Sequence, residues 1–179
     1  MYAFKGFNKD LKCRGYQFEM GIKAVTEDAN CVKNGFHCAE NPLTCFVYYP
    51  NVRKSIYCLV EITGDMDEDD VDDKISCTEL TPLKRLSVEE LLLEGAKYIA
   101  RWPYRKNANC VQKETGTGYI YAVVRGKNPI VKVEKNCVIA LIKEKQESPE
   151  VEEVAIARVP ETGTYKIVNH RLEMIINDV

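Results

Sequence analysis

Most of the structural information in this chain lies in "YAFKGFNKDLKCRGYQFEMG" at residues 2–21 and "GFHCAENPLTCFVYYP" at residues 35–50. Aromatic residues, which favour strands, recur in the first stretch, and glycines and polar residues separate them. We therefore predict strands over residues 2–7 and 16–25. The second stretch contains a Gly-Phe-His turn ahead of a short helix.

That short helix is predicted to begin at Asn41-Pro42 and to end before Pro50. An asparagine side chain can cap a helix, and proline suits the first helical position. Beyond it, "SIYCLVEIT" at 55–63 and "KISCTEL" at 74–80 are rich in strand-forming residues and predict two further strands.

The clearest helix signal starts at Ser87, which forms a capping box with Glu90. The helix is predicted to end near Trp102-Pro103. Its apolar residues recur at helical spacing and form one face: Val88, Leu91, Leu92, Ala96 and Ile99.

Residues 118–176 contain at least four strand-like segments, with turn signals at 126–129, 147–149 and 160–164. Connections this short favour antiparallel or solenoid-like packing over β-α-β crossovers.

These patterns predict an α+β protein. Residues 1–101 would form a mixed α/β unit with two helices, 102–117 a linker, and 118–179 an antiparallel, β-rich unit. The sequence leaves open whether the two units share one core.

Composition narrows the functional classes. The net charge is −2, the isoelectric point is near 5.8, and the basic residues are scattered, so direct nucleic-acid binding is not expected. No charged leader precedes an apolar stretch, and the longest apolar runs are too short to span a bilayer. We therefore expect a cytoplasmic protein with no membrane association.

The eight cysteines include no C-x-x-C pair, so no zinc site is predicted. Cys58, Cys77 and Cys137 lie in apolar runs and are expected to be buried, reduced thiols. Phosphate-binding glycine loops, nucleophile elbows and H-E-x-x-H motifs are absent from the sequence, so no cofactor is predicted.

Seven of the nine residues from 65 to 73 are acidic. Asp70 occupies the position where an EF-hand needs glycine, and Ser76 the position of its last glutamate, so calcium binding is not predicted. A solvated surface loop is one interpretation. The other is that Asp67, Asp69 and Asp70 imitate nucleic-acid phosphates to a basic protein partner.

The amino-terminal stretches, together with "NCVIALIKE…VEEVAIARV…TYKIVNHRLEMI", resemble an uncharacterised family of small proteins encoded by phages and prophages. Longer members insert short repeats where this chain has residues 101–136, which contain no repeat. The resemblance implies a viral protein in the host-cell cytoplasm, with a role in host takeover or defence evasion.

The order of residues near the amino terminus also resembles the ADP-ribosyltransferase fold. This resemblance implies a nucleotide cleft whose residues would be Lys5 or Arg14, Tyr16, His37, Tyr49 and Glu79. A complete R-S-E or H-Y-E set is not present. A cleft that has lost the chemistry fits as well.

His37 is open to structural, binding and catalytic interpretations. Adjacent strand residues point to opposite faces, so His37 and Cys38 cannot form a nucleophilic pair directly.

Arg101, Trp102 and Tyr104, followed by Arg105, combine the residue types that dominate interface hot spots. The alternative is a linker packed over the end of the helix.

We therefore predict a non-enzymatic, phage-associated accessory protein that binds a host or defence protein. The alternatives are an ADP-ribosyltransferase-like, nucleotide-binding enzyme and a virion or structural component.

Overall fold

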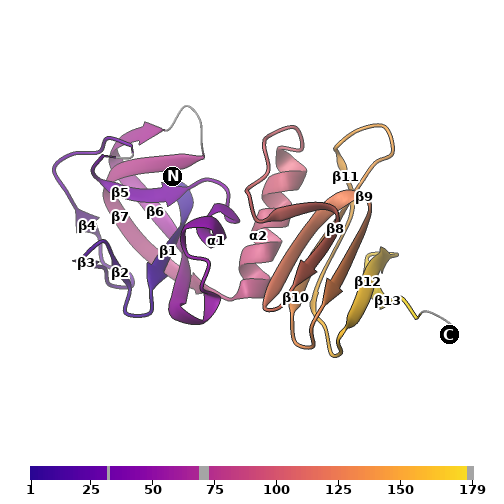
Figure 1. Ribbon diagram of the computed structural model, residues 1–179. Helices are drawn as coiled ribbons and strands as arrows, with labels where there is room; N and C mark the ends of the chain where they lie inside the picture. Colours follow the sequence, from indigo (N-terminus) through magenta and orange to yellow (C-terminus); the bar gives the residue numbers. More distant parts are fainter. Residues whose placement is uncertain (32, 69–72, 177–179) are drawn as a thin grey trace. The chain divides into compact units, whose positions relative to one another are not determined.

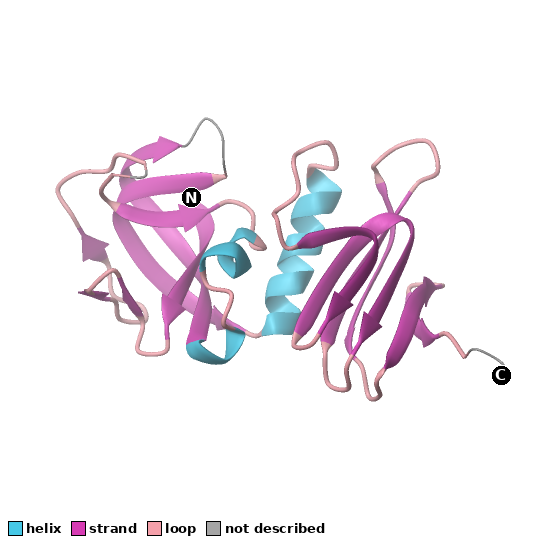
Figure 2. Cartoon of the chain, viewed as in Figure 1, coloured by secondary structure: helices cyan, strands magenta, loops and turns pink. Residues whose placement is uncertain are grey.

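The computed structural model describes residues 1–31, 33–68 and 73–176, and divides the chain into two compact units, Met1–Ser87 and Val88–Val179. Strands account for 54% of the structure and helices for 13% (Figure 2). The α+β prediction is therefore wrong, and the fold is mostly β. Several strands run well beyond the segments that were predicted, whereas the described helices are one of five residues and one of 14.

The first unit contains strands β1 to β7, helix α1 and one 3-10 turn (Figure 1). In chain order these are β1 Tyr2–Asn8, β2 Lys12–Cys13, β3 Tyr16–Gln17, β4 Ala24–Val25, β5 Phe36–Ala39, α1 Thr44–Tyr48, the 3-10 turn Val52–Lys54, β6 Ser55–Glu68 and β7 Lys74–Leu86.

Four antiparallel strands of this unit form a near-barrel. β5 pairs with β1, β1 with β6, β6 with β7, and β7 with β5, while β4 extends from β7. The interior is apolar and includes Phe7, Val60, Ile62, Cys77 and Leu80. Burying these side chains supplies the main stabilising free energy of the unit.

The wall of the near-barrel is incomplete between β1 and β5. These two strands share a single backbone register pair, Phe4 with Ala39, whereas β1 pairs along its whole length with β6. β1 and β5 therefore diverge beyond this pair. Where the two strands separate, side chains from both line the same pocket.

The strand predicted over 16–25 is wrong in its middle. Gly21 has φ +75°, and the amide of Ile22 donates to the carbonyl of Glu19 at 3.2 Å, so the chain turns between β3 and β4. Phe18 is 3% exposed and packs into the core instead of continuing an edge strand.

The short helix α1 begins at Thr44, later than predicted. The Asn41 side chain accepts a hydrogen bond from the amide of Leu43 at 3.0 Å and so caps the turn that leads into the helix. Asp73, at the start of the chain's return to the sheet, accepts bonds from the amide of Asn41 and the hydroxyl of Thr44. These bonds attach α1 to the strand end.

The second unit begins with helix α2 and continues with β8 to β13. Its elements are α2 Val88–Arg101, β8 Val111–Gly118, β9 Tyr121–Val133, β10 Val138–Glu144, β11 Val151–Arg158, β12 Gly163–Val168 and β13 Arg171–Met174. The structure therefore groups α2 with the second unit, and β8 begins inside the 102–117 segment that was assigned to a linker.

The expectation of an antiparallel sheet in this unit is also wrong. β8 pairs with β9, and β9 with β10, in parallel, although the β10–β11, β9–β12 and β12–β13 pairs are antiparallel.

β9 folds back on itself, which explains how short connections produce parallel pairs. Lys113 and Thr115 in β8 lie opposite Arg125 and Ile130 in β9, so residues 126–129 bulge out of the register. A chain reversal at this bulge brings the two halves of β9 face to face. A local pattern of alternating residues does not distinguish such an arch from a hairpin.

The backbone at the ends of β9 agrees with this reversal. Val138 starts β10 beside Tyr121, the first residue of β9, and the amide of Glu134 donates to the carbonyl of Gly118 at 3.4 Å. Both ends of β9 therefore lie at the same end of the unit.

The result is two facing β layers with α2 against one of them. An apolar core fills the space between the layers: Ala122, Val124, Val131, Val133, Cys137, Ile139, Leu141, Val159 and Tyr165. α2 packs on β10 and β11 and buries Leu91, Leu92, Ala96 and Ile99, four of the five residues of the predicted apolar face.

Candidate functional site

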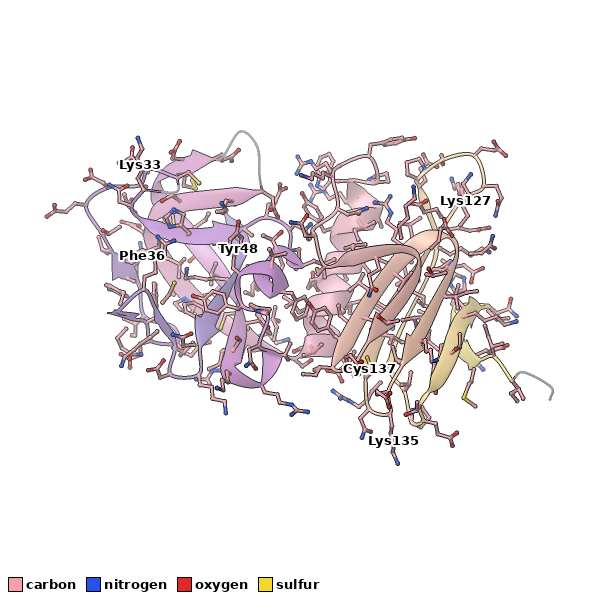
Figure 3. All side chains as sticks on the ribbon, in the orientation of Figure 1. Lys33, Phe36, Tyr48, Lys127, Lys135 and Cys137 are labelled. Atoms are coloured by element: carbon pink, nitrogen blue, oxygen red, sulfur yellow. The ribbon has the colours of Figure 1, made fainter. Side chains whose placement is uncertain are left out.

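A pocket of about 390 Å³ lies in the first unit, where β1 and β5 diverge. It is lined by residues from β1, the β2–β3 hairpin, β5, α1 and the start of β7: Phe4, Lys5, Gly6, Cys13, Arg14, Tyr16, Phe18, Gly35, Phe36, His37, Cys38, Ala39, Thr44, Cys45, Tyr48, Tyr49 and Lys74. Figure 3 labels two of them, Phe36 on β5 and Tyr48 at the end of α1.

Lys5 is the most unusual residue of the pocket. It lies on the same face of β1 as Ala3 and Phe7, because side chains two residues apart in a strand point to the same side. Like them it is buried, with 4% of its surface exposed. Its ammonium group donates a hydrogen bond to the carbonyl of His37, and lies 5.4 Å from the ring centroid of Phe7. No carboxylate among the described residues pairs with it. A buried charge without a counter-ion is costly, and a bound anion would remove that cost.

Arg14 and Lys74 add two further positive charges to the lining of the pocket. Arg14 is held in the β2–β3 turn at φ +47° and is exposed. Burial lowers the pKa of His37 below its usual value of 6.5, and the positive charges of Lys5, Arg14 and Lys74 lower that pKa further. The imidazole is therefore mainly neutral at pH 7.

The charge of the pocket is opposite to that of the unit around it. Residues 1–87 carry 14 acidic and 11 basic side chains. Among the described residues that line the pocket, the ionised side chains are basic and no carboxylate contributes. The positive charge is thus a property of this site and not of the whole surface.

Aromatic rings form a second part of the lining. The Tyr16 ring lies 4.7 Å from that of Phe18 and 4.9 Å from that of Phe36, centroid to centroid. Tyr16 keeps 41% of its surface exposed, so this aromatic cluster faces solvent at the pocket. On another side the ring of Tyr49 packs against Gly6 so closely that a Cβ at Gly6 would overlap the ring.

Three thiols also line the pocket. The hydroxyl of Tyr49 donates to the sulfur of Cys13 at 3.1 Å, and burial, followed by this bond, raises the pKa of Tyr49. Cys45 is buried. A hydrogen bond with Cys77 and burial raise the pKa of Cys38 well above its usual value. A nucleophilic cysteine needs a lowered pKa, so the surroundings of Cys38 act against activation of its thiol.

The residues proposed for a nucleotide cleft are mostly brought together. Arg14, Tyr16, His37 and Tyr49 all line the pocket. Glu79 does not. Its carboxylate pairs with Lys23 at 2.8 Å and accepts a bond from Thr63, away from the lining residues.

Sequence reasoning missed several lining residues, including Phe36, Tyr48 and Lys74. For Lys5 the sequence did contain a signal: residue alternation along β1 places this lysine on the same side of the strand as Ala3 and Phe7, and so predicts that it is buried.

The acidic candidates have separate surroundings. Residues 65–68 belong to β6, so this part of the predicted loop is strand. Asp67 accepts a hydrogen bond from the amide of Cys31 at 2.6 Å, which gives it a structural role. Asp69 and Asp70 lie outside the described residues.

Arg101 and Trp102 lie together in the second unit at the end of α2, and Tyr104 follows two residues after Trp102. The guanidinium carbon of Arg105 lies 4.5 Å from the indole centroid, and that of Arg101 lies 5.3 Å from it. Arg105 also donates to the hydroxyl of Tyr98 at 2.9 Å. Trp102 is 37% exposed and Tyr104 74% exposed. The cluster is thus ordered by stacking but remains accessible.

In the parts of the chain that the structure describes, no helix is long and apolar enough to cross a membrane. Within the same residues, no three histidine, cysteine, aspartate or glutamate side chains are grouped so that they could hold a metal ion.

The chain belongs to the family described as a domain of unknown function, DUF7666, whose model matches residues 1–94. This match covers the whole first unit, and therefore the pocket, and ends within α2. No curated protein matches the chain, and no solved structure does.

Proposed function

We propose that the first unit is a binding module for a small anionic molecule, which enters the pocket between β1 and β5. The observation that carries this proposal is the buried ammonium group of Lys5, which lines the pocket without a carboxylate partner among the described residues. Arg14 and Lys74 add positive charge to the lining around it, and the His37 imidazole adds a neutral polar group.

The proposal is for binding and not for group transfer. An ADP-ribosyl transfer of the kind suggested by the sequence resemblance would need a carboxylate near the ligand, and the candidate Glu79 is held elsewhere by Lys23 and Thr63. The Cys38 thiol is not activated as a nucleophile in its place, because its pKa is raised.

A thermal unfolding experiment on the full chain tests this proposal. Inorganic phosphate, citrate, AMP and NAD are added separately at millimolar concentration, because ligands that bind only the folded state raise the unfolding temperature. At least one of these anions should stabilise the wild type and Lys9→Met, in which an exposed lysine is removed, but not Lys5→Met. If no anion stabilises the wild type, or all three proteins respond equally, the proposal fails.

A second candidate function is protein binding through the cluster at Arg101, Trp102 and Tyr104. Exposed tryptophan and tyrosine next to stacked arginines are the observation that favours it. The resemblance of the amino-terminal stretches to phage and prophage proteins supports a host or defence protein as the partner, in the host cytoplasm.

The test is a pull-down from host lysate with a matched control. Trp102→Ala combined with Tyr104→Ala should lose a partner that the wild type captures in stoichiometric amounts. Tyr119→Ala, which removes another exposed tyrosine of the same unit (80% exposed), should retain it. Equal capture by both variants would contradict a role for this cluster.

The alternative of a virion or structural component has less support. Self-association through β8 would require free backbone groups along its outer edge. The Gln112 side chain instead bonds both the carbonyl and the amide of Thr117, at 2.8 Å and 2.9 Å, and so occupies two of these groups.

A further inference from the structure

The pocket has two chemically different parts, and together they restrict the ligand more than its charge alone does. One part is cationic, formed by Lys5, Arg14 and Lys74 around His37. The other is aromatic and centres on Tyr16 and its neighbours. A simple anion such as sulfate would use only the first part.

We infer that the ligand is a nucleoside monophosphate, whose phosphate lies among the cationic residues and whose base stacks on the aromatic cluster at Tyr16. This inference rests on the proposed function, because it assumes that the pocket binds an anion.

The cationic part favours phosphate over carboxylate. Lys5, Arg14 and Lys74 line the same pocket as His37, so three positive charges border one cavity. A phosphate monoester carries nearly two negative charges at neutral pH and has three strong acceptor oxygens. A carboxylate has one charge and two oxygens, and so offers these cationic residues less charge and fewer acceptors.

The aromatic part favours a planar group attached to that phosphate. Nucleic-acid bases stack on exposed aromatic side chains, and Tyr16 offers such a ring, supported by an edge-on contact with Phe36 and a tilted contact with Phe18. Tyr16 and Arg14 lie two residues apart on the same small hairpin. One hairpin can therefore contact both the base and the phosphate.

The size of the pocket is compatible with a single nucleotide. Its volume of about 390 Å³ is near the lower end of the range of roughly 300–1,000 Å³ found for small-molecule sites.

Isothermal titration calorimetry on the full chain tests the inference, with AMP, GMP, CMP, UMP, ribose 5-phosphate and adenosine as probes. At least one nucleoside monophosphate should bind about tenfold more tightly than ribose 5-phosphate, because a stacked base adds affinity that the sugar phosphate lacks. Adenosine should bind much more weakly than AMP.

Variants of Tyr16 separate stacking from charge. Tyr16→Ala should lower the affinity for the nucleoside monophosphate about tenfold and leave that for ribose 5-phosphate unchanged, whereas Tyr16→Phe should retain both. Tyr2→Ala, which removes an exposed tyrosine of β1 that does not line the pocket, is the matched control and should behave as the wild type.

The outcomes distinguish the inference from the proposed function. If ribose 5-phosphate binds as tightly as every nucleotide, and Tyr16→Ala changes nothing, the base contact is wrong while anion binding through Lys5 stands. If none of the phosphorylated probes binds and the anions of the unfolding experiment also fail, both are wrong.

Discussion

Each unit buries one basic side chain to the same extent, but the two side chains have very different surroundings. Lys5 in the first unit and Arg125 in the second are both 4% exposed. Arg125 has its Nε 2.6 Å from a carboxylate oxygen of Glu144, and it donates to the side chain of Asn107 and to the carbonyls of Pro103 and Pro149. Lys5 has the carbonyl of His37 and aromatic rings, and no carboxylate among the described residues.

This difference separates a buried charge that has a structural role from one that, as we propose, binds a ligand. The four partners of Arg125 come from three separate segments, so the guanidinium holds those segments to β9. Lys5 lines a pocket and holds fewer groups together. A buried cation that is paired with a carboxylate stabilises its surroundings, whereas a buried cation without one is a site where an external anion gains binding energy.

The largest expected effect is that of Arg125→Met. Removing the guanidinium leaves the carboxylate of Glu144 without its partner, and should lower the free energy of unfolding of the second unit by about 3–5 kcal/mol. Trp102, the single tryptophan of the chain, reports the unfolding of this unit by fluorescence in urea. Arg171→Met, at an exposed position on β13, is the control; an equal loss in both variants would remove the distinction drawn for Arg125.

A smaller effect is expected from Gly35→Ala beside the pocket. Gly35 has φ +83°, and a Cβ there would overlap the hydroxyl of Ser76 and approach Ala29. The substitution should lower the free energy of unfolding of the first unit by about 2–3 kcal/mol, measured by circular dichroism in urea.

Gly15→Ala separates the two causes of this loss. Gly15 has a similar φ of +84°, but nothing lies within 4 Å of the added Cβ. It should therefore show only the conformational cost, about 1 kcal/mol. Equal losses at both positions would mean that the close approach of Ser76 to Gly35 does not contribute to the change in the free energy of unfolding.

Lys5→Met should change the free energy of unfolding by no more than about 1 kcal/mol in the absence of ligand, because methionine fills the same space and removes an unpaired charge. Urea unfolding with and without a bound anion checks this expectation. A loss as large as that of Arg125→Met would place Lys5 among the structural charges and would contradict the comparison of the two units.

The smallest expected effect is a pH dependence from His37. Its pKa in the folded chain lies below the usual 6.5, because of burial and of Lys5 from β1, Arg14 from the β2–β3 turn and Lys74 from β7. The unfolded chain therefore binds more protons than the folded chain near pH 6, so stability is present above pH 6.5 and is lost as the pH falls through the folded-state pKa.

His37→Gln should reduce the loss of stability between pH 7.5 and 5.5, measured as the change in urea midpoint. His170→Gln, at the exposed tip of the β12–β13 hairpin, should not reduce it. An undiminished pH dependence in His37→Gln would mean that other groups account for the effect.

Local patterns in the sequence were sufficient for features that depend on neighbouring residues. Two such predictions are confirmed: Cys58, Cys77 and Cys137 are buried, and α2 has nearly the predicted extent. Both depend on an apolar run or a helical period that can be recognised within a short stretch of sequence. Arg14, Tyr16, His37 and Tyr49, which were grouped from a resemblance to a known cleft, line one pocket, and their role in binding stays a prediction.

Features that depend on pairing between distant segments required the tertiary structure. Closure of β7 onto both β5 and β6, the reversal within β9 and the position of Glu79 beside Lys23 all join residues far apart in the sequence or change direction without a local signal. The same holds for Lys5: alternation along β1 places it on the inner side of the strand, but only the divergence of β1 from β5 turns a buried lysine into the base of a pocket.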